Sequence, residues 1–240
     1  MTTIINDIIG ESNNFITFKR QNNGQQNQRN QRNQQKSRKN SRSSQRASGT
    51  TTPLWPNGLV YYRIDNSLSS HRRLIQNAMK NIESRSCVKF RQRTNQNNYI
   101  QFFKGDGCYS TVGKAGGRQY LSLGTGCHDI GSAMHEILHA LGFYHEHMRS
   151  DRDQFITIHW NNIENGMQDQ FQKISTKKNK IYTKFDYNSI MIYGNTAFSK
   201  NGKNTMTAKA KGVRLIESHF KRHLSPLDVQ TLNLMYKCNK

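Results

Sequence analysis

The sequence predicts an α+β fold, with strands and helices in mixed order behind a long polar N-terminal segment. This prediction rests on three observations: about 50 initial residues that offer little to a core, several short strand-like runs, and segments of helical periodicity placed among those runs. A chain of 240 residues has room for one domain of roughly 190 residues beside such a tail.

Segment 1–48 is predicted to be disordered. From Gln21 to Lys36 it consists almost entirely of Asn, Gln and Arg, and Gln21–Arg46 contains no aromatic or β-branched residue. Such a stretch buries too little apolar surface to offset the entropy that is lost on ordering. It is either a solvated linker or pro-segment, or a polybasic arm that touches an anionic surface or nucleic acid.

The domain predicted for residues 49–240 begins with strands and one helix. Strand-like runs lie at 59–64, 88–91, 99–103 and 119–123. Between the first two, a helix capped by Ser69 or Ser70 runs to about Arg85. The apolar residues on one face of that helix are Ile75, Met79 and Ile82.

Two further helices are predicted. The helix at 130–141 has an apolar stripe made of Ala133, Met134, Ile137, Leu138 and Leu141. After Gly142 the regular signals thin out until a last helix near the C-terminus. That helix opens with Ser225-Pro226-Leu227-Asp228, which supplies an N-cap serine, a proline at N1 and an acid at N3.

Charge and hydrophobicity limit the classes of protein. The chain has 36 Lys and Arg against 15 Asp and Glu, a net charge of +21. This excess favours anionic partners such as nucleic acid, sulfated glycan or lipid headgroups. No run of 18 apolar residues is present, so we expect no transmembrane segment. The first 20 residues lack the apolar core of a standard signal peptide.

The four cysteines, Cys87, Cys108, Cys127 and Cys238, are widely spaced and form no C-x-x-C pair. This pattern argues against a cysteine zinc ribbon or a thioredoxin-type redox site. An even number with wide spacing fits disulfides in an oxidising compartment, and buried free thiols are the alternative. Four cysteines allow three pairings, and the sequence alone selects none of them.

The chemistry is concentrated in the stretch HEILHALGFYH on the second helix. His135 and His139 share one face of the helix and can bind the same metal ion, while Glu136 can reach a water on that metal. Gly142 can adopt a positive φ, and the resulting turn lets His145 approach from a third direction. Three histidines with an open fourth position are the arrangement of a catalytic zinc site.

The extended motif is far more specific than H-E-x-x-H alone, which arises often by chance. The alternative is a helix whose histidines are ordinary surface or core residues. That alternative does not explain why a polar His-Glu pair stands in an otherwise apolar helix. The remaining histidines are expected at the surface rather than as ligands: His71, His128, His147, His159, His219 and His223.

The stretch HEILHALGFYHE, ending at Glu146, resembles the zinc signature of the astacin family of metalloendopeptidases, within the metzincins. The resemblance covers roughly residues 54–238. Its other segments, in the family's order, are Gln119–Gly124 before Cys127, His147–Asp153, the Met-turn Phe185–Tyr193, Leu224–Asp228 and Tyr236–Cys238. On these segments the chain is identified as a member of the family.

The resemblance implies a two-subdomain protease with a twisted mixed sheet and an active-site helix above a zinc cleft. The N-subdomain would span about 49–142 and the C-subdomain about 143–240. One catalytic Zn²⁺ would be bound by His135, His139 and His145, with Glu136 as the general base. Tyr193 would ligate zinc in the resting enzyme and swing out to stabilise the transition state; outside this motif it would be an ordinary core tyrosine.

Other roles follow from the same resemblance. Met191 would lie beneath the zinc, although alone it would be an ordinary core Met. Glu146 would pair with the N-terminal ammonium formed on activation; its alternative is a surface acid paired with Arg149 or Arg152. The disulfides would be Cys87–Cys238 and Cys108–Cys127. The enzyme would be a secreted monomer acting on protein or peptide substrates.

The implied reaction is hydrolysis of internal peptide bonds. Zinc lowers the pKa of its water to about 7, and Glu136 takes the proton as hydroxide attacks the peptide carbonyl. Glu136 then gives the proton to the leaving amine, while zinc and Tyr193 stabilise the oxyanion. An extended substrate would add as a strand to a sheet edge near Cys108–Gly113.

The chain departs from the family pattern in two places. Ile192 stands where the Met-turn usually has His, and because that position is not a zinc ligand we expect activity to survive with an altered rate or pH optimum. Residues 1–50 also lack the Phe-x-Gly-Asp stretch whose Asp caps zinc in family zymogens; Phe103–Asp106 mimics it inside the domain. We expect no aspartate-based latency, and a cut after Arg46 would leave a start at Ala47.

Substrate preference and one competing function stay open. The family often favours an acidic residue just after the cut, and Lys221 and Arg222 lie in the region of that pocket. The competing function is a cationic anion-binding protein on a protease scaffold with vestigial hydrolysis. The intact histidines and Glu136 argue for the endopeptidase, whereas Ile192, the missing signal peptide and the basic arm keep the competing function open.

Overall fold

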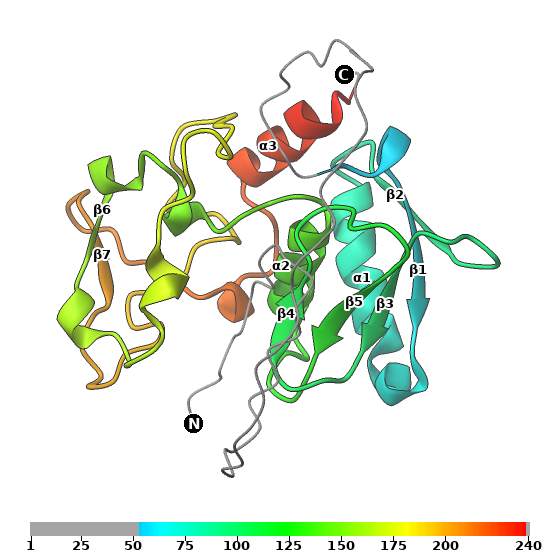
Figure 1. The fold of residues 1–240 in the computed structure, drawn as a ribbon, viewed down its shortest axis with the longest axis horizontal. Helices are drawn as coiled ribbons and strands as arrows, with labels where there is room; N and C mark the ends of the chain where they lie inside the picture. Colours follow the sequence, from blue (N-terminus) through cyan, green and yellow to red (C-terminus); the bar gives the residue numbers. More distant parts are fainter. Residues whose placement is uncertain (1–52, 239–240) are drawn as a thin grey trace, which may run out of the picture. The chain divides into compact units, whose positions relative to one another are not determined.

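The computed structural model describes residues 53–238, so the segment predicted to be disordered lies outside the described residues. It confirms the α+β class (Figure 1). The strands and α-helices, in chain order, are β1 (Leu59–Ile64), α1 (Arg72–Glu83), β2 (Lys89–Gln92), β3 (Tyr99–Phe103), β4 (Cys108–Ser110), β5 (Arg118–Leu123), α2 (Ile130–Ala140), β6 (Ile156–Ile158), β7 (Met206–Ala208) and α3 (Pro226–Tyr236).

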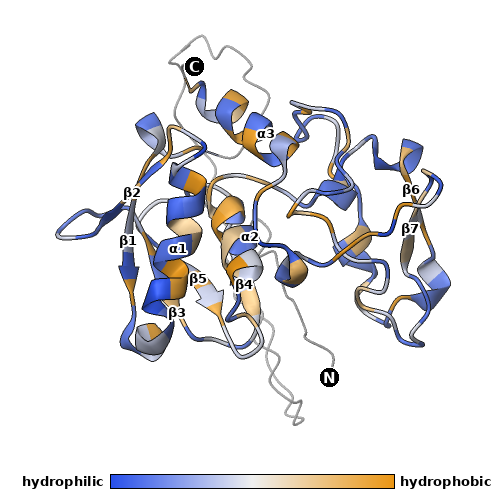
Figure 2. Cartoon of the chain, turned by 180° about the vertical axis from the view of Figure 1, so that it is seen from behind, coloured by the Kyte–Doolittle hydropathy of each residue, from blue (hydrophilic) through white to orange (hydrophobic). Residues whose placement is uncertain are grey.

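The main sheet is mixed, with strand order β2-β1-β3-β5-β4. β2, β1, β3 and β5 pair in parallel, and β4 pairs antiparallel to β5 at one edge. Both α1 and α2 pack on the same face, as the view from behind shows (Figure 2), and the predicted residues Ile75, Met79 and Ile82 of α1 are buried there. The sheet thereby gives α2 a rigid support.

The predicted start of the first helix was wrong. Ser69 and Ser70 lie in a 3-10 turn, Asn66–His71, and α1 begins at Arg72 without a side-chain cap. Asp65 caps the 3-10 turn instead, because its carboxylate accepts a hydrogen bond from the Ser67 backbone N–H. The strands β6 and β7 were not predicted, since three residues are too few to establish a period of two, whereas β4 lies where a sheet edge was expected, near Cys108–Gly113.

The chain between Gly142 and α3 consists mainly of loops and 3-10 turns around a smaller core. That core contains Ile156, Ile163, Phe171, Phe185, Ile192, Tyr193, Met206 and Leu215. Arg152 is buried beside it and donates from Nη1 to the carbonyl oxygens of His147 (2.9 Å) and Phe171 (2.7 Å). Buried polar contacts of this kind replace the regular ladder that a sheet would supply.

Two disulfides join distant parts of the chain. Cys87, just before β2, is bonded to Cys238, just after α3, and Cys108 of β4 is bonded to Cys127 in the loop before α2. The first closes a loop across most of the domain, with a sequence separation of 151. Within residues 53–238, no helix has both the length and the apolar content needed to cross a bilayer.

Candidate metal centre

The helix α2 is buried along its whole length and carries three side chains of the motif, His135, Glu136 and His139. Asp129 begins the helix, since its carboxylate accepts from the Ser132 N–H at 2.8 Å. Near this end, Gly131 lies so close to the 3-10 turn Ser218–Phe220 that a Cβ would come within 2.0 Å of a backbone oxygen. The absence of a side chain lets the two segments pack directly.

The imidazoles of His135, His139 and His145 converge on one point. Nε2 of His145 lies 3.1 Å from Nε2 of His135 and 3.1 Å from Nε2 of His139. Nδ1 of His135 donates to the Ile190 carbonyl, and Nδ1 of His139 donates to the Phe143 carbonyl, each at 2.8 Å. With the ring proton fixed on Nδ1, the Nε2 lone pairs face one another, which is unfavourable unless a cation lies among them.

The donor set fits zinc. Three Nε2 atoms bound at the usual Zn–N length of about 2.0–2.1 Å in tetrahedral geometry would lie about 3.3 Å apart, close to the observed separations. All three rings are buried, and burial together with the neighbouring His139 lowers the pKa of His145 well below its usual value. A neutral imidazole is the form that binds a metal.

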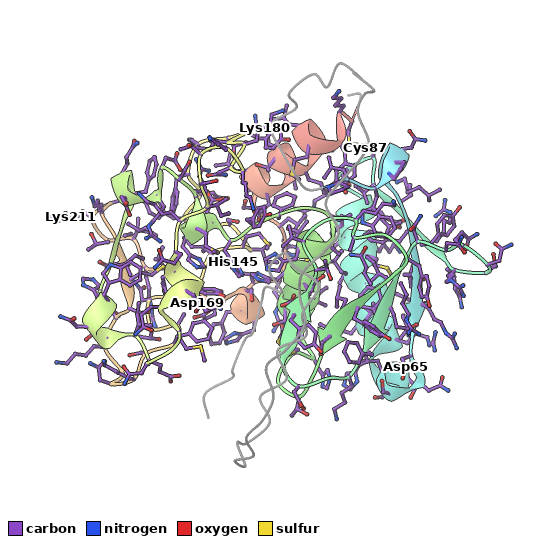
Figure 3. All side chains as sticks on the ribbon, in the orientation of Figure 1. Asp65, Cys87, His145, Asp169, Lys180 and Lys211 are labelled. Carbon is purple, nitrogen blue, oxygen red and sulfur yellow. A yellow bond between two sulfur atoms is a disulfide. The ribbon has the colours of Figure 1, made fainter. Side chains whose placement is uncertain are left out.

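The turn after α2 brings His145 back to the helix. Gly142 has φ +107°, a backbone conformation that glycine adopts readily, and a Cβ there would approach the Leu54 side chain to 2.8 Å. The Glu146 N–H then donates to the carbonyl of Met191 at 2.9 Å, which fixes the backbone next to the third histidine. His145 is labelled at this junction between the two halves in Figure 3.

The Met-turn supports the site through its backbone. Met191 is 1% exposed in the main core, and its neighbour Ile190 supplies the carbonyl that orients His135. Ile192 is fully buried in the smaller core, so the residue that replaces the family's usual His packs among apolar side chains.

Asp228 holds the Met-turn in place, a role that the sequence analysis missed. Its Oδ1 accepts from the Ser189 hydroxyl (2.6 Å) and its Oδ2 from the Ile190 N–H (2.9 Å). The N3 acid of the predicted capping box was recognised, and the box is present, but that pattern does not reveal contacts beyond the helix. Lys221 also contacts the turn, donating from Nζ to the Ser189 carbonyl at 2.5 Å. Burial lowers the pKa of Lys221 to about 8.

His147 is fully buried, so its predicted surface position was wrong. Its ring stacks on the His145 ring (centroids 5.0 Å apart) and on the Tyr193 ring (4.1 Å), with Phe171 at its edge. Buried and half-buried residues alternate from His145 to Arg149, where the chain turns through the 3-10 helix Glu146–Met148. No local sequence pattern marked His147 as buried, because its burial depends on where the chain passes after the zinc motif.

Tyr193 lies beside the three histidines, with its ring centroid 4.5 Å from that of His145 and 2% of the residue exposed. It belongs to the smaller core, whereas His135 and His139 belong to the helix. The structure thus brings Glu136, Tyr193 and the three histidines of the motif into one place.

Glu146 lines a cavity of about 80 Å³ together with Leu54, Asp186 and Asp228, and His145 lines it as well. Its Oε1 accepts from Arg149 Nη1 and from the Asp186 N–H, each at 2.8 Å. Burial is the main cause that raises the pKa of Glu146 to about 7, against the opposing effect of Arg149. The Glu146 side chain is only 16% exposed, so Glu146 is not the surface acid of the alternative interpretation. The ion pair with Arg149 that this interpretation predicted is present.

Known proteins match this fold and motif. The family model named Astacin, which describes a family of peptidases, matches residues 47–237. The chain is 44% identical over 189 residues to astacin-like metalloprotease toxin 1 of Loxosceles intermedia, covering 77% of this chain and 72% of that protein. It is also 44% identical over 193 residues to zinc metalloproteinase nas-8 of Caenorhabditis elegans, covering 79% of this chain and 48% of the nematode protein.

A solved structure agrees with these matches. High choriolytic enzyme 1, a hatching enzyme zinc-protease from the medaka fish Oryzias latipes, superposes with a TM-score of 0.72 at 34% identity. The superposition covers 83% of this chain and 100% of the fish enzyme. This chain therefore belongs to the astacin family of zinc metalloproteases.

Proposed function

We propose that this protein is an endopeptidase that hydrolyses internal peptide bonds of extended protein substrates, with His135, His139 and His145 holding one zinc ion. The observation that carries the proposal is the convergence of the three Nε2 atoms beside the buried Glu136. Zinc held there supplies Lewis acidity and lowers the pKa of a water molecule to about 7.

Glu136 is the general base of this proposal. It follows His135 directly on α2 and is 1% exposed, so it is shielded from bulk water and adjoins a proposed metal ligand. Glu136 takes a proton from the attacking water and delivers it to the nitrogen of the leaving amine. Its support is positional, since the rigid helix fixes the carboxylate relative to both histidines that share the helix.

Tyr193 stabilises the oxyanion by donating a hydrogen bond from its hydroxyl. Its ring packs against His145 and His147 and belongs to the irregular half of the domain. Met191 supports the same site through its place in the core and through its carbonyl, which accepts a hydrogen bond from the Glu146 N–H.

The substrate adds to the edge of the main sheet. β4 is the last strand in the sheet order and pairs on one side only among the described residues, with β5. Just beyond it, the Gly113 N–H donates to the carbonyl of His139 at 2.8 Å, which ties this edge to the metal-binding helix. A peptide pairing with β4 would therefore run past the zinc ligands.

Glu146 receives the N-terminal ammonium of a trimmed chain. A buried carboxyl whose pKa is raised to about 7, in a cavity shared with Asp186 and Asp228, favours an added positive charge. Leu54 lines the same cavity, and the seven residue steps from Ala47 to Leu54 span at most about 25 Å. A cut after Arg46 would thus place the new terminus within reach.

An acidic preference after the cut rests on the basic residues beyond the 3-10 turn Ser218–Phe220. Lys221 is engaged with the Met-turn, so the exposed Arg222 is the better candidate for an acidic side chain. The two disulfides suggest an extracellular protein, and we propose that it acts there as a monomer. The competing function, a cationic binding protein with vestigial hydrolysis, gains no support from the relatives, which include zinc metalloproteinases.

The test is cleavage of a denatured protein by the purified chain, with and without a zinc chelator, beside a Glu136→Ala variant. We expect cleavage that the chelator abolishes and that zinc restores, and no cleavage by the variant. Chelator-resistant cleavage, or equal cleavage by the variant, would overturn the proposed mechanism. A zinc-loaded, disulfide-bonded chain trimmed near Ala47 that cleaves nothing would overturn the proposed function.

A further inference from the structure

The main sheet has a second face on which neither of its packing helices lies. α1 and α2 both cover the face that carries Val60, Ile100 and Leu121, which belong to the main core (Figures 1 and 2). Because side chains alternate along a strand, the neighbouring residues point to the opposite face. Within residues 53–238, no helix packs on that face.

This outer face alternates arginine or lysine with aromatic side chains. Its residues are Leu59, Tyr61, Arg63, Lys89, Arg91, Tyr99, Gln101, Phe103, Tyr109, Arg118, Tyr120 and Ser122. The strand register places Arg91 opposite Tyr61 and Arg118 opposite Tyr99. Four of the twelve residues are cationic and none is acidic, whereas a random surface would mix both signs.

The cations of the face are exposed and spread across it. Arg63, Lys89, Arg91 and Arg118 are all exposed. Arg91 has 62% of its side chain exposed and its closest acid, Glu83, is 4.0 Å away at the edge of the sheet. Since neighbouring strands lie about 4.8 Å apart, the columns that carry Arg91 and Arg118 are separated by about 14 Å. An extended polyanion could contact several of these cations at once.

Two of the tyrosine rings of the face hold a guanidinium group each. The guanidinium of Arg118 lies 5.0 Å from the Tyr120 ring centre, and that of Arg93, at the end of β2, lies 4.3 Å from the Tyr99 ring centre. Stacking of this kind limits the motion of an arginine and leaves its N–H groups directed at an anion. Binding of single-stranded nucleic acid instead requires rings on which bases can stack.

We propose that this outer sheet face binds a sulfated polysaccharide. Arginine forks match the oxygens of such anions, and none of the twelve strand residues of the face is acidic, although Glu83, Asp65 and Asp106 lie at its edges. The two disulfides place the protein in an oxidising compartment, where sulfated glycans are found and nucleic acid is rare. The proposal is independent of the peptidase reaction, because the face lies on the side of the sheet opposite to α2.

The test uses the full chain and a fluorescent heparin fragment as the sulfated polysaccharide. The sheet variant combines Arg63→Gln, Arg91→Gln and Arg118→Gln. A matched control combines Lys200→Gln, Lys203→Gln and Lys211→Gln, three exposed lysines of the other half of the domain, where Figure 3 labels Lys211. Both variants lose three charges and keep residues 1–52, so a contribution from that basic segment is the same in each.

We expect the sheet variant to raise the dissociation constant for heparin at least about tenfold at 0.15 M salt. The number of counterions released on binding, measured from the salt dependence of that constant, should fall by about two. The control should change the dissociation constant less than about threefold. Equal losses of heparin affinity in the two variants, or no loss of affinity in either, would overturn the proposal. Cleavage of a short uncharged peptide should be the same in both variants, which separates this proposal from the proposed peptidase.

A second measurement avoids substitutions altogether and covers the case in which the sheet variant fails to fold. Heparin should protect Arg63, Arg91 and Arg118 of the unaltered protein from phenylglyoxal, while the exposed Arg214 and Arg222 keep their reactivity. Unchanged modification of the sheet arginines would refute the site. An oligodeoxythymidylate of equal charge that binds more tightly than heparin and quenches tyrosine fluorescence would reassign the face to nucleic acid.

Discussion

In residues 53–142, a five-stranded sheet and two helices bury aliphatic side chains, whereas residues 143–238 contain one two-stranded sheet, the helix α3, and long stretches of loops and 3-10 turns. The first half is held mainly by apolar packing on one face of its sheet. The second relies on buried polar groups such as Arg152, whose guanidinium satisfies two backbone carbonyls, and Asp228, which holds the Met-turn.

The metal centre draws on both halves. The rigid helix α2 supplies His135, His139 and Glu136, and the irregular half supplies His145 and Tyr193. The comparison teaches that the regular half fixes the direction of the ligands, while the hydrogen bonds of the irregular half bring the remaining groups to meet them.

The largest effect on stability should come from the disulfide that joins the ends of the domain. The double variant Cys87→Ala/Cys238→Ala should lose about 5 kcal/mol of unfolding free energy, because that bond closes a loop with a sequence separation of 151. The double variant Cys108→Ala/Cys127→Ala should lose about 3 kcal/mol, since its separation is only 19. Urea unfolding measures both losses, and a greater loss from the shorter loop would contradict this ranking.

The next effect concerns the contribution of α2 to catalysis. Glu136→Gln keeps the shape of the side chain but removes the base, so kcat should fall about a thousandfold, or about 4 kcal/mol in activation free energy. Zinc content, measured by atomic emission, should stay at one ion per chain. The exposed acid Asp169, changed to Asn, is the control and should leave kcat unchanged. A kcat for Glu136→Gln within tenfold of the unaltered enzyme would remove Glu136 from its proposed role.

A pH-dependent effect is expected at Glu146 in the untrimmed chain. Its folded pKa of about 7 exceeds the unfolded value of about 4.3, so the folded state binds more protons between these pH values. Stability from this carboxyl is therefore fully present below pH 4 and is lost as the pH rises through 7. Relative to the unaltered protein, Glu146→Gln should gain up to about 3 kcal/mol between pH 4 and 7.

Thermal unfolding across this pH range measures the gain. Trimming near Ala47 should reduce it, because an added ammonium would stabilise the ionised carboxyl. Two results would contradict the proposed pairing. One is a stability difference between Glu146→Gln and the unaltered protein that is the same at every pH, and the other is a gain that trimming leaves unchanged.

The smallest effect concerns the support of the Met-turn by α3. Asp228→Asn should lower the unfolding free energy by about 2 kcal/mol, because the carboxylate accepts from the Ser189 hydroxyl and the Ile190 N–H. Zinc affinity should fall about tenfold, since Ile190 orients His135. Competition with a chelating dye measures the affinity, with Asp169→Asn as the matched control. A loss of stability without a loss of affinity would limit Asp228 to a structural role.

The sequence predicted the first half of the fold well and the second half poorly. The strand-like run at 59–64 and the helical spacing around Ile75 are local patterns, and the structure confirms both. The loops after Gly142 carry no period, because buried polar contacts between distant residues hold them. His147 shows the limit, since its burial depends on where the chain passes after the zinc motif.

The motif itself was predictable because its spacing is set by one helix turn and one glycine. The convergence of His135, His139 and His145 was expected from that spacing, and the structure places them as one group. Their supports were not predictable, since Ile190 lies 55 residues after His135 and Asp228 a further 38 residues after Ile190.

The central claim is that three histidines from the two halves hold one zinc ion. X-ray absorption at the zinc edge of the purified, disulfide-bonded chain tests it most directly. The account predicts one zinc per chain with a first shell of three imidazole nitrogens at about 2.0–2.1 Å, reduced to two in His145→Ala. A sulfur shell at about 2.3 Å, or a spectrum that His145→Ala leaves unchanged, would contradict it.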